Sequence, residues 1–234
     1  MLRNSLVLSS LLSNSESWYN LTKRDISKLE DVDEEMLWKL LFAHSKTPIE
    51  LLYLETGSIP IRFILMNRRL NFLQYILQED ENSLIHQFLI AQSENPSKSD
   101  WVTTVRNDLR DLEINLTFED IKNTSKSVFK KIVKERVKNK AFQHLVDVQQ
   151  THSKSKDIQY SDLQLQNYLK PGNNMTIKEK SFVFSLRSRM LNIYGNFKNG
   201  KSDISCRKCN MWYGWGKPET FISMSKTMWQ FNHG

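Results

Sequence analysis

Lysines recur at helical spacing in the middle of this chain, where they could bind a polyanion. Lys126, Lys130 and Lys134 follow one another at intervals of four residues, so a helix would place all three on one side. A row of ammonium groups releases counterions from a phosphate backbone without reading its base sequence. The alternative is an ordinary solvated helix face with lysine at its outward positions.

Other basic residues could extend such a surface, including a second patch close to the cysteines. Arg68 and Arg69 interrupt an apolar helical segment, and two roles are open to them. They could reach a phosphate, or they could pair with acidic residues and extend out of the core. The candidate nucleic-acid-binding residues are Arg68, Arg69, Lys122, Lys126, Lys130, Lys131, Lys134, Arg187, Arg189, Arg207 and Lys208.

Cys206 and Cys209 have the Cys-x2-Cys spacing of half a tetrahedral zinc site. A complete site needs four nitrogen or sulfur ligands, but no third cysteine is present and His233 is the only later histidine. We therefore expect no cofactor; an incomplete zinc site and two unligated thiols on a short hairpin are the open alternatives. Two cysteines cannot build a disulfide framework, which favours an intracellular location, in the nucleus or cytoplasm.

The sequence does not contain a recognisable catalytic grouping. Acidic residues cluster at 30–35 and 79–81, around a helix start and in a connection between helices, where no strand–turn–strand metal site is indicated. The five histidines are far apart, and neither His-Glu-x-x-His nor Gly-x-Ser-x-Gly occurs. We expect a protein that is not an enzyme.

Helix signals predict the elements that must position these residues. Thr22 with Asp25, and Thr176 with Glu179, have the spacing of capping boxes, and residues 47–50 combine a cap, a first-turn proline and a glutamate. Apolar residues recur every three or four positions without sustained alternation. The expected fold is all-α, an irregular multi-helix bundle with a short Cys-x2-Cys hairpin and a poorly ordered C-terminal tail.

Two polar breaks divide the chain, at residues 95–99 and 151–157. They predict an N-terminal helical subdomain (1–95), a basic helical subdomain (96–150), a C-terminal helical segment with the cysteine pair (151–209) and an irregular tail (210–234). No apolar run approaches the roughly 18 residues of a membrane span, so we expect no membrane partner.

Charge is unevenly distributed along the chain. Residues 1–119 carry 12 Lys and Arg against 18 Asp and Glu, whereas residues 120–210 carry 19 against 7. The basic block favours nucleic acid as a partner. The acidic N-terminal half could instead dock on a protein.

Several segments, in order from Leu2 to Cys209, carry a resemblance to a known family. They are Leu2-Arg3-Asn4-Ser5 with Leu11-Leu12, Trp18-Tyr19-Asn20-Leu21-Thr22, Thr47 to Leu77, Asp100-Trp101-Val102, Leu186 to Leu191, Asn196-Phe197 and the cysteine pair. Together they resemble the region downstream of the polymerase core in LINE-type, non-LTR retrotransposon reverse transcriptases. The chain departs from that pattern after Cys209, where the family has a later histidine and cysteine.

The resemblance implies a helical remnant that helps hold template RNA or target DNA. The aromatic-x-Asp-Asp motif of reverse transcriptases is missing from this sequence, so no polymerase activity is implied. Three interpretations stay open: a non-catalytic nucleic-acid-binding module, a helical protein-interaction fragment with an exposed apolar face at residues 6–12 or 212–229, and a retroelement remnant without function.

Overall fold

The computed structural model describes residues 3–44, 46–152 and 155–190. Residues Met1–Ser188 form one compact unit, and a second unit comprises Arg189–Gly234, of which only the first two residues are described. The described part is mostly α-helical and contains no strand, as the sequence predicts. The predicted boundaries after residues 95 and 150 both fall inside the first unit.

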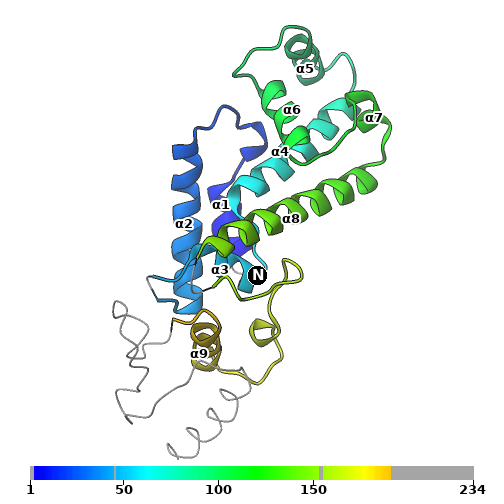
Figure 1. Ribbon diagram of the computed structural model, residues 1–234. Coiled ribbons are helices and arrows are strands. Elements are labelled where there is room, and N and C mark those ends of the chain that lie inside the picture. The colour runs from blue at the N-terminus through cyan, green and yellow to red at the C-terminus, as the bar shows by residue number, and fades with distance from the viewer. Residues whose placement is uncertain (1–2, 45, 153–154, 191–234) are drawn as a thin grey trace, which may run out of the picture. The chain divides into compact units, whose positions relative to one another are not determined.

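The helices follow one another through short connections (Figure 1). Their order is η1 (Arg3–Leu8, a π-helix), α1 (Ser9–Leu11), η2 (Ser15–Ser17, a 3-10 helix), α2 (Lys23–Leu41), α3 (Ile49–Thr56), α4 (Ile61–Gln78), α5 (Leu84–Glu94), α6 (Trp101–Asp111), α7 (Phe118–Asn123), α8 (Lys126–Thr151), η3 (Asn167–Leu169, a 3-10 helix) and α9 (Ile177–Arg187).

Local cap chemistry explains most of the helix starts. Capping boxes open α2 at Thr22, α7 at Thr117 and α9 at Thr176, because each threonine accepts from a backbone N–H that would otherwise lack a partner. The cap expected at Thr47 is wrong. Helix α3 follows Pro48 without a side-chain cap, and the Thr47 hydroxyl is buried with no hydrogen-bond partner.

The core surrounds α4, which packs against α2, α5, α6, α7 and α8. Its buried side chains include Phe63, Leu70 and Leu73, so α4 is apolar on several sides, as expected for a central helix. A smaller cluster joins Leu8 and Leu12 of the N-terminal segment to α4. The apolar face expected to be exposed at residues 6–12 is therefore partly used inside the protein.

The end of α3 is joined to the segment that follows α8. Gly57 ends α3 in the left-handed conformation (φ 62°), and a Cβ there would lie 2.4 Å from the backbone of Gln164 and Leu165. The backbone N–H of Gln166 donates to the Glu55 carbonyl at 3.0 Å. Only glycine fits so close an approach, and this contact fixes the course of residues 155–169 across α3.

Candidate nucleic-acid interface

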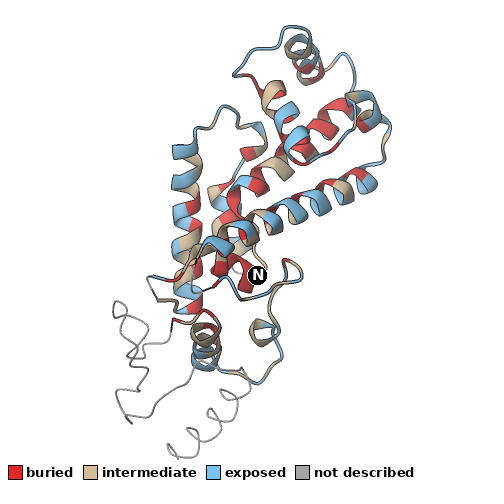
Figure 2. Ribbon diagram, viewed as in Figure 1, coloured by how far each residue is buried: buried red, intermediate tan, exposed pale blue. Residues whose placement is uncertain are grey.

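Helix α8 buries one narrow stripe and exposes the rest. Its buried residues recur every four positions, from Phe129 through Val133 and Val137 toward the C-terminus, and they face α3 and α4. Figure 2 shows this division, with buried residues on the side toward α4 and exposed residues on the outer side. Residues four apart form a row along a helix, and a helix has four such rows. Only one of the four rows is buried over the first half of α8, so the side chains of the other three are available to solvent.

Four lysines occupy the exposed side of this first half. Lys126, Lys130 and Lys134 form one row, as predicted, and Lys131 lies on the adjacent outward row; all four are exposed. The row spans about 12 Å of helix axis at 1.5 Å per residue. We call Lys126, Lys130, Lys131 and Lys134 the α8 lysine face.

Acidic residues within the described ranges leave this face unpaired. No ion pair involves any of its four lysines there, and the first turn of α8 contains no acidic residue. Two neighbouring residues on α8, Glu135 and Arg136, are also exposed and carry opposite charges. The face therefore keeps its positive charge in solution.

Lys122, another candidate binding residue, lies on a different helix from this row. It lies on α7, and the extended backbone of Thr124 and Ser125 ends that helix before α8 begins. Its ammonium group donates to Glu81 at 2.9 Å. The hydrogen bond with Lys122 lowers the pKa of the Glu81 carboxyl, and the same bond raises the pKa of Lys122.

Acidic partners also limit the row beyond Lys134. Lys138 donates to Asp162 at 2.6 Å, and this hydrogen bond lowers the pKa of the Asp162 carboxyl. Lys140 lies 3.6 Å from Glu113. The free positive charge of α8 is consequently concentrated in its first three turns.

Arg68 and Arg69 serve the interior of the protein. Arg69 forms a buried two-point ion pair with Asp108, at 2.6 and 2.9 Å. Arg68 donates to the Leu12 carbonyl and, at 3.2 Å, to the Ser15 hydroxyl. Of the two roles open to them in the sequence, the structure supports pairing within the fold for Arg69 and fixation of the N-terminal segment for Arg68.

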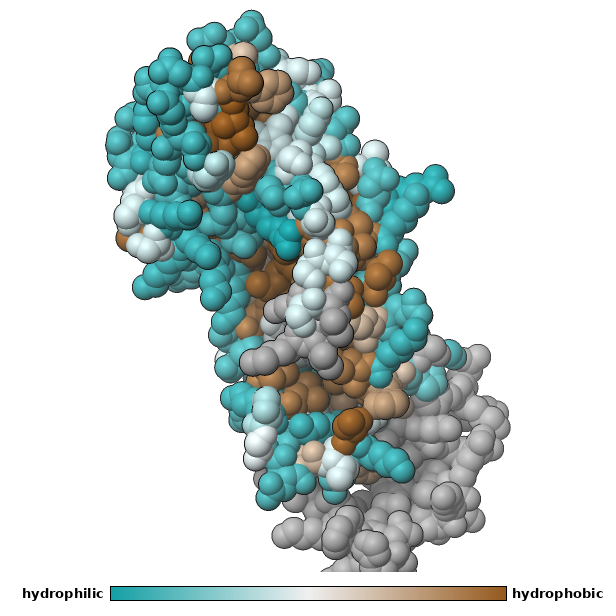
Figure 3. Space-filling model, turned by 180° about the vertical axis from the view of Figure 1, so that it is seen from behind, coloured by the Kyte–Doolittle hydropathy of each residue, from teal (hydrophilic) through white to brown (hydrophobic). Residues whose placement is uncertain are grey.

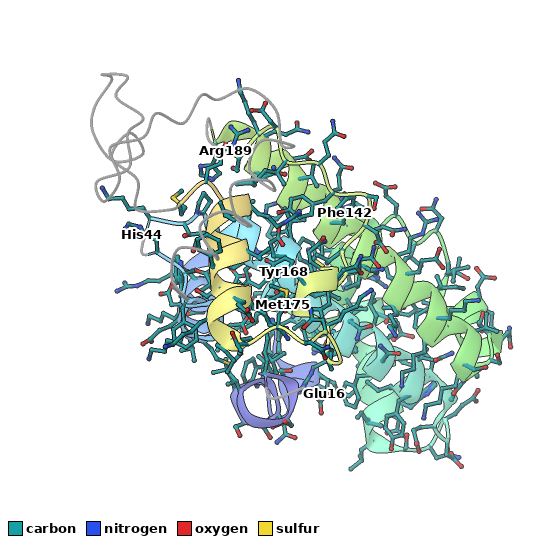
Figure 4. The ribbon with its side chains drawn as sticks, turned by 90° about the horizontal axis from the view of Figure 1, so that it is seen from below. Glu16, His44, Phe142, Tyr168, Met175 and Arg189 are labelled. Carbon is teal, nitrogen blue, oxygen red and sulfur yellow. The ribbon has the colours of Figure 1, made fainter. Side chains whose placement is uncertain are left out.

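Arg187 is engaged in a cluster around Glu55. The Glu55 carboxylate is 1% exposed and accepts from Arg187 at 2.8 Å, from Tyr160 at 2.6 Å and from Tyr168 at 2.8 Å. Burial, reinforced by Glu55, raises the pKa of both tyrosines. Figure 4 includes Tyr168 among its labelled residues. This cluster fastens the segment after α8 to α3, so the Arg187 guanidinium is not free for phosphate.

The remaining predicted site residues lie at the end of the chain. Arg189 is partly exposed and belongs to the second unit. Arg207, Lys208, Cys206 and Cys209 fall outside the described residues, so the hairpin and its zinc half-site stay predictions. In the ranges that are described, no group of three or more His, Cys, Asp or Glu is placed to hold a metal ion.

Buried acidic residues of the N-terminal half pair with arginines inside the fold. Asp33, fully buried, accepts from Arg3 twice at 2.6 Å and from Tyr53 at 3.0 Å. Glu30 holds Arg62 at 2.7 and 2.9 Å. These acids are therefore committed to arginines of the same half and do not reach the α8 lysine face.

A pocket that the sequence did not indicate lies at the end of α6. It encloses about 710 Å³ between α6 and the start of α7, and its lining includes Arg106, Arg110, Glu113 and Phe118. Arg106 lies over the Phe118 ring at 5.6 Å, and Glu113 is the residue that pairs with Lys140. The two exposed arginines are four residues apart, a signal that the sequence contains.

Comparisons with other proteins add no family to this picture. No helix in the described residues is long and apolar enough to cross a membrane. No protein-family model matches the chain, and searches of curated proteins and of solved structures found no significant match.

Proposed function

We propose that this chain is a non-catalytic helical module that binds RNA or DNA through the phosphate backbone. The observation that carries the proposal is the α8 lysine face, four exposed ammonium groups within about 12 Å that have no acidic partner among the described residues. Several other basic candidates, including Lys122 and Arg69, form ion pairs with acidic residues of the same chain. Phosphate is the ligand that a cluster of unpaired ammonium groups fits best.

Energetics favour an external partner over a merely solvated face. Like charges four residues apart on a helix destabilise it by roughly 0.2–0.5 kcal/mol per pair. The spacing of Lys126, Lys130 and Lys134 gives two such pairs and Lys131 with Lys134 adds a third, whereas Lys131 with Glu135 forms one opposite-charge pair that offsets part of the repulsion. A phosphate chain would neutralise this repulsion and release its own counterions.

Lysine also indicates the mode of binding. An ammonium group is a compact charge that lacks the planar fork with which arginine reads a guanine edge. The α8 lysine face therefore suits sequence-tolerant binding. The resemblance to the post-polymerase region of LINE-type retrotransposons supports the same class of partner, and we propose that origin for the chain; a genomic reading frame that continues upstream into polymerase motifs would test it.

Fluorescence anisotropy with a labelled 20-nucleotide single-stranded RNA and a 20-base-pair DNA duplex tests the binding. Changing Lys126, Lys130 and Lys134 together to glutamine should weaken binding of both probes by at least about tenfold at 100 mM salt, since each lysine contributes to counterion release. The matched control is Lys23→Gln/Lys28→Gln/Lys178→Gln, which removes the same charge at other exposed sites.

Binding should stay near the wild-type value in this control, because net charge alone contributes a diffuse attraction that salt screens. If the α8 triple variant and the control lose affinity equally, binding depends on net charge and the proposed site is wrong. If wild-type protein does not bind either probe at 100 mM salt, the proposed function itself is wrong.

A further inference from the structure

Helix α5 is apolar on both its inner and its outer side. Its inner side packs on α4 and α6 and includes the buried residues His86 and Leu89. On the outer side, Leu84 is 85% exposed and Phe88 is 59% exposed. Large apolar side chains that gather on one exposed helix face commonly mark an interaction surface, and the outer side of α5 faces solvent.

The exposed apolar residues of α5 are contiguous. Leu84, Phe88 and Ala91 are separated by four and three residues and therefore share one face with the exposed Gln87, and Ile90, 43% exposed, lies beyond Gln87. Figure 3 shows apolar surface near the end of the molecule at which α5 lies in Figure 1. We call Leu84, Phe88, Ile90 and Ala91 the α5 outer face.

Acidic residues border this face at both ends. Residues 79–94 contain four acids and neither lysine nor arginine. Glu79, Asp80 and Glu81 precede Leu84, and Glu94 follows Ala91 by three residues. Lys122 engages only Glu81, whereas Arg106 of α6 donates to the Ser93 carbonyl beside Glu94 at 3.5 Å, so the negative charge is stronger at the end that carries Glu79 and Asp80. The charge pattern thus selects a partner with apolar residues at its centre and basic residues on its flanks.

We infer that the α5 outer face docks a basic amphipathic helix of a partner protein. The eleven residues of α5 extend about 16 Å, which accommodates three to four turns of a helix packed along them. Apolar residues of the partner at i, i+4 and i+7 would contact Leu84, Phe88 and Ala91, and lysine or arginine at its two ends would face Asp80 and Glu94.

One side of an eleven-residue helix buries less surface area than a stable complex, in which about 800 Å² is buried per partner. The expected association is therefore reversible, with micromolar affinity. The α5 outer face and the α8 lysine face consist of different residues, so the inference does not depend on nucleic-acid binding.

A designed helical peptide serves as the probe. It has 18 residues, with leucine along one side and lysine elsewhere, and carries a fluorescent label; its twin replaces each lysine with glutamate. Binding to the full 234-residue chain is measured at 150 mM salt, which screens attraction between distant charges. The lysine peptide should bind with micromolar affinity, and the glutamate twin should bind at least about tenfold more weakly.

Two protein variants separate the apolar and the charged contributions. Leu84→Ser/Phe88→Ser should weaken the lysine peptide by at least about tenfold, the loss expected when apolar contacts worth about 1.4 kcal/mol are removed. Asp80→Lys/Glu94→Lys should reverse the preference between the twins. The matched control is Val32→Ser/Leu40→Ser, which removes two apolar side chains, 49% and 52% exposed, from the acidic helix α2.

Three results would overturn the inference. The first is unchanged binding of the lysine peptide to Leu84→Ser/Phe88→Ser, and the second is an equal loss in the α2 control. The third is a concentration-dependent dimer of wild-type protein in sedimentation that the α5 double variant abolishes, because the face would then join two copies of this chain. The α8 triple variant should bind the peptide normally, which keeps this test independent of the nucleic-acid proposal.

Discussion

Replacing Glu55 with glutamine should destabilise the fold strongly, although it hardly changes the shape of the side chain. Its carboxylate accepts from Tyr160, Tyr168 and Arg187 and is 1% exposed. Glutamine keeps the size of the side chain but removes its charge and turns one acceptor oxygen into an amide donor. Glu55→Gln should therefore leave at least one of these three donors without an acceptor.

The cost can be worked out from the surroundings of each group. Removing one partner of a fully buried ion pair typically costs about 3–5 kcal/mol. Arg187 is 37% exposed, so water can solvate part of its charge, which places the ionic loss below that range, at about 2 kcal/mol. A tyrosine hydroxyl left unsatisfied in the interior adds about 1 kcal/mol. We expect Glu55→Gln to lower the free energy of unfolding by about 3 kcal/mol.

Urea and thermal unfolding, followed by circular dichroism, measure this loss. For a unit of this size, 3 kcal/mol corresponds to a decrease of roughly 6–12 °C in Tm. The matched control is Glu35→Gln, which breaks an ion pair with Lys39 at 2.6 Å whose side chains are 67% and 75% exposed. An exposed pair contributes about 0–1 kcal/mol, so the control should unfold close to wild type.

Limited proteolysis locates the effect. If Glu55 fastens the segment after α8, cleavage within residues 155–188 should become faster in Glu55→Gln while α4 and α8 stay protected. A loss below about 1 kcal/mol, or a loss no greater than in Glu35→Gln, would refute the assignment of this cluster as the main attachment of that segment.

Three further outcomes follow from the same structure. The triple variant of the α8 lysine face should reduce the slope of log binding constant against log salt by about 2.7 for duplex DNA or about 2.1 for a single strand; an unchanged slope would exclude these lysines from the interface. Burial and neighbouring acids raise the pKa of Glu34 from 4.5 to about 7, so the free energy of unfolding should fall as pH rises from about 4.5 to 7. Glu34→Gln should therefore be more stable than wild type at pH 8, by about 1 kcal/mol after allowance for partial exposure. Equal stability of the two proteins at pH 8 in urea unfolding would contradict this. Gly57→Ala should cost at least about 2 kcal/mol in the same assay, since its Cβ would meet backbone at 2.4 Å, whereas Gly172→Ala (φ 89°) has nothing within 4 Å and should cost less.

Local signals in the sequence were sufficient for the helices. Thr22 with Asp25, and Thr176 with Glu179, act within four residues of each other, and both capping boxes form. The apolar spacing of α8 indicates a helix but not which row of it is buried: Val128 is 52% exposed, whereas Phe129, Val133 and Val137 belong to the buried stripe. The helix cap predicted at Thr47 is wrong because the spacing of Thr47 fits a cap, but the backbone begins the helix one residue later than that spacing requires. The Thr124-Ser125 pair could have been read as the end of one helix and the start of another, which would have separated Lys122 from the row.

Ion pairing could not be predicted in the same way, because its partners are distant in sequence. Arg69 and Asp108 are 39 residues apart, and Arg187 and Glu55 are 132 apart. No periodicity links such residues before the fold brings them together. The position of Glu55 directly after the apolar residues 51–54 of α3 was the available hint that it has an internal partner, since a buried carboxylate requires one.

The distribution of arginine and lysine gives the proposed function its physical basis. Among the described residues, the buried acids in ion pairs use arginine, in the pairs Arg3–Asp33, Arg62–Glu30, Arg69–Asp108 and Arg187–Glu55. A planar guanidinium satisfies a buried carboxylate at two points, whereas an ammonium group retains more of its hydration. Arginines thus pair with the buried acids, whereas four lysines, unpaired within the described ranges, lie on the outer side of α8. Hydrated point charges at helical spacing suit a flexible phosphate chain better than a fixed base edge. Substituting arginine for Lys126, Lys130 and Lys134 should therefore preserve affinity for the phosphate backbone, because all three positive charges remain. A strong sequence preference in the wild-type protein would contradict this account, because contacts to the phosphate backbone carry no base-sequence information.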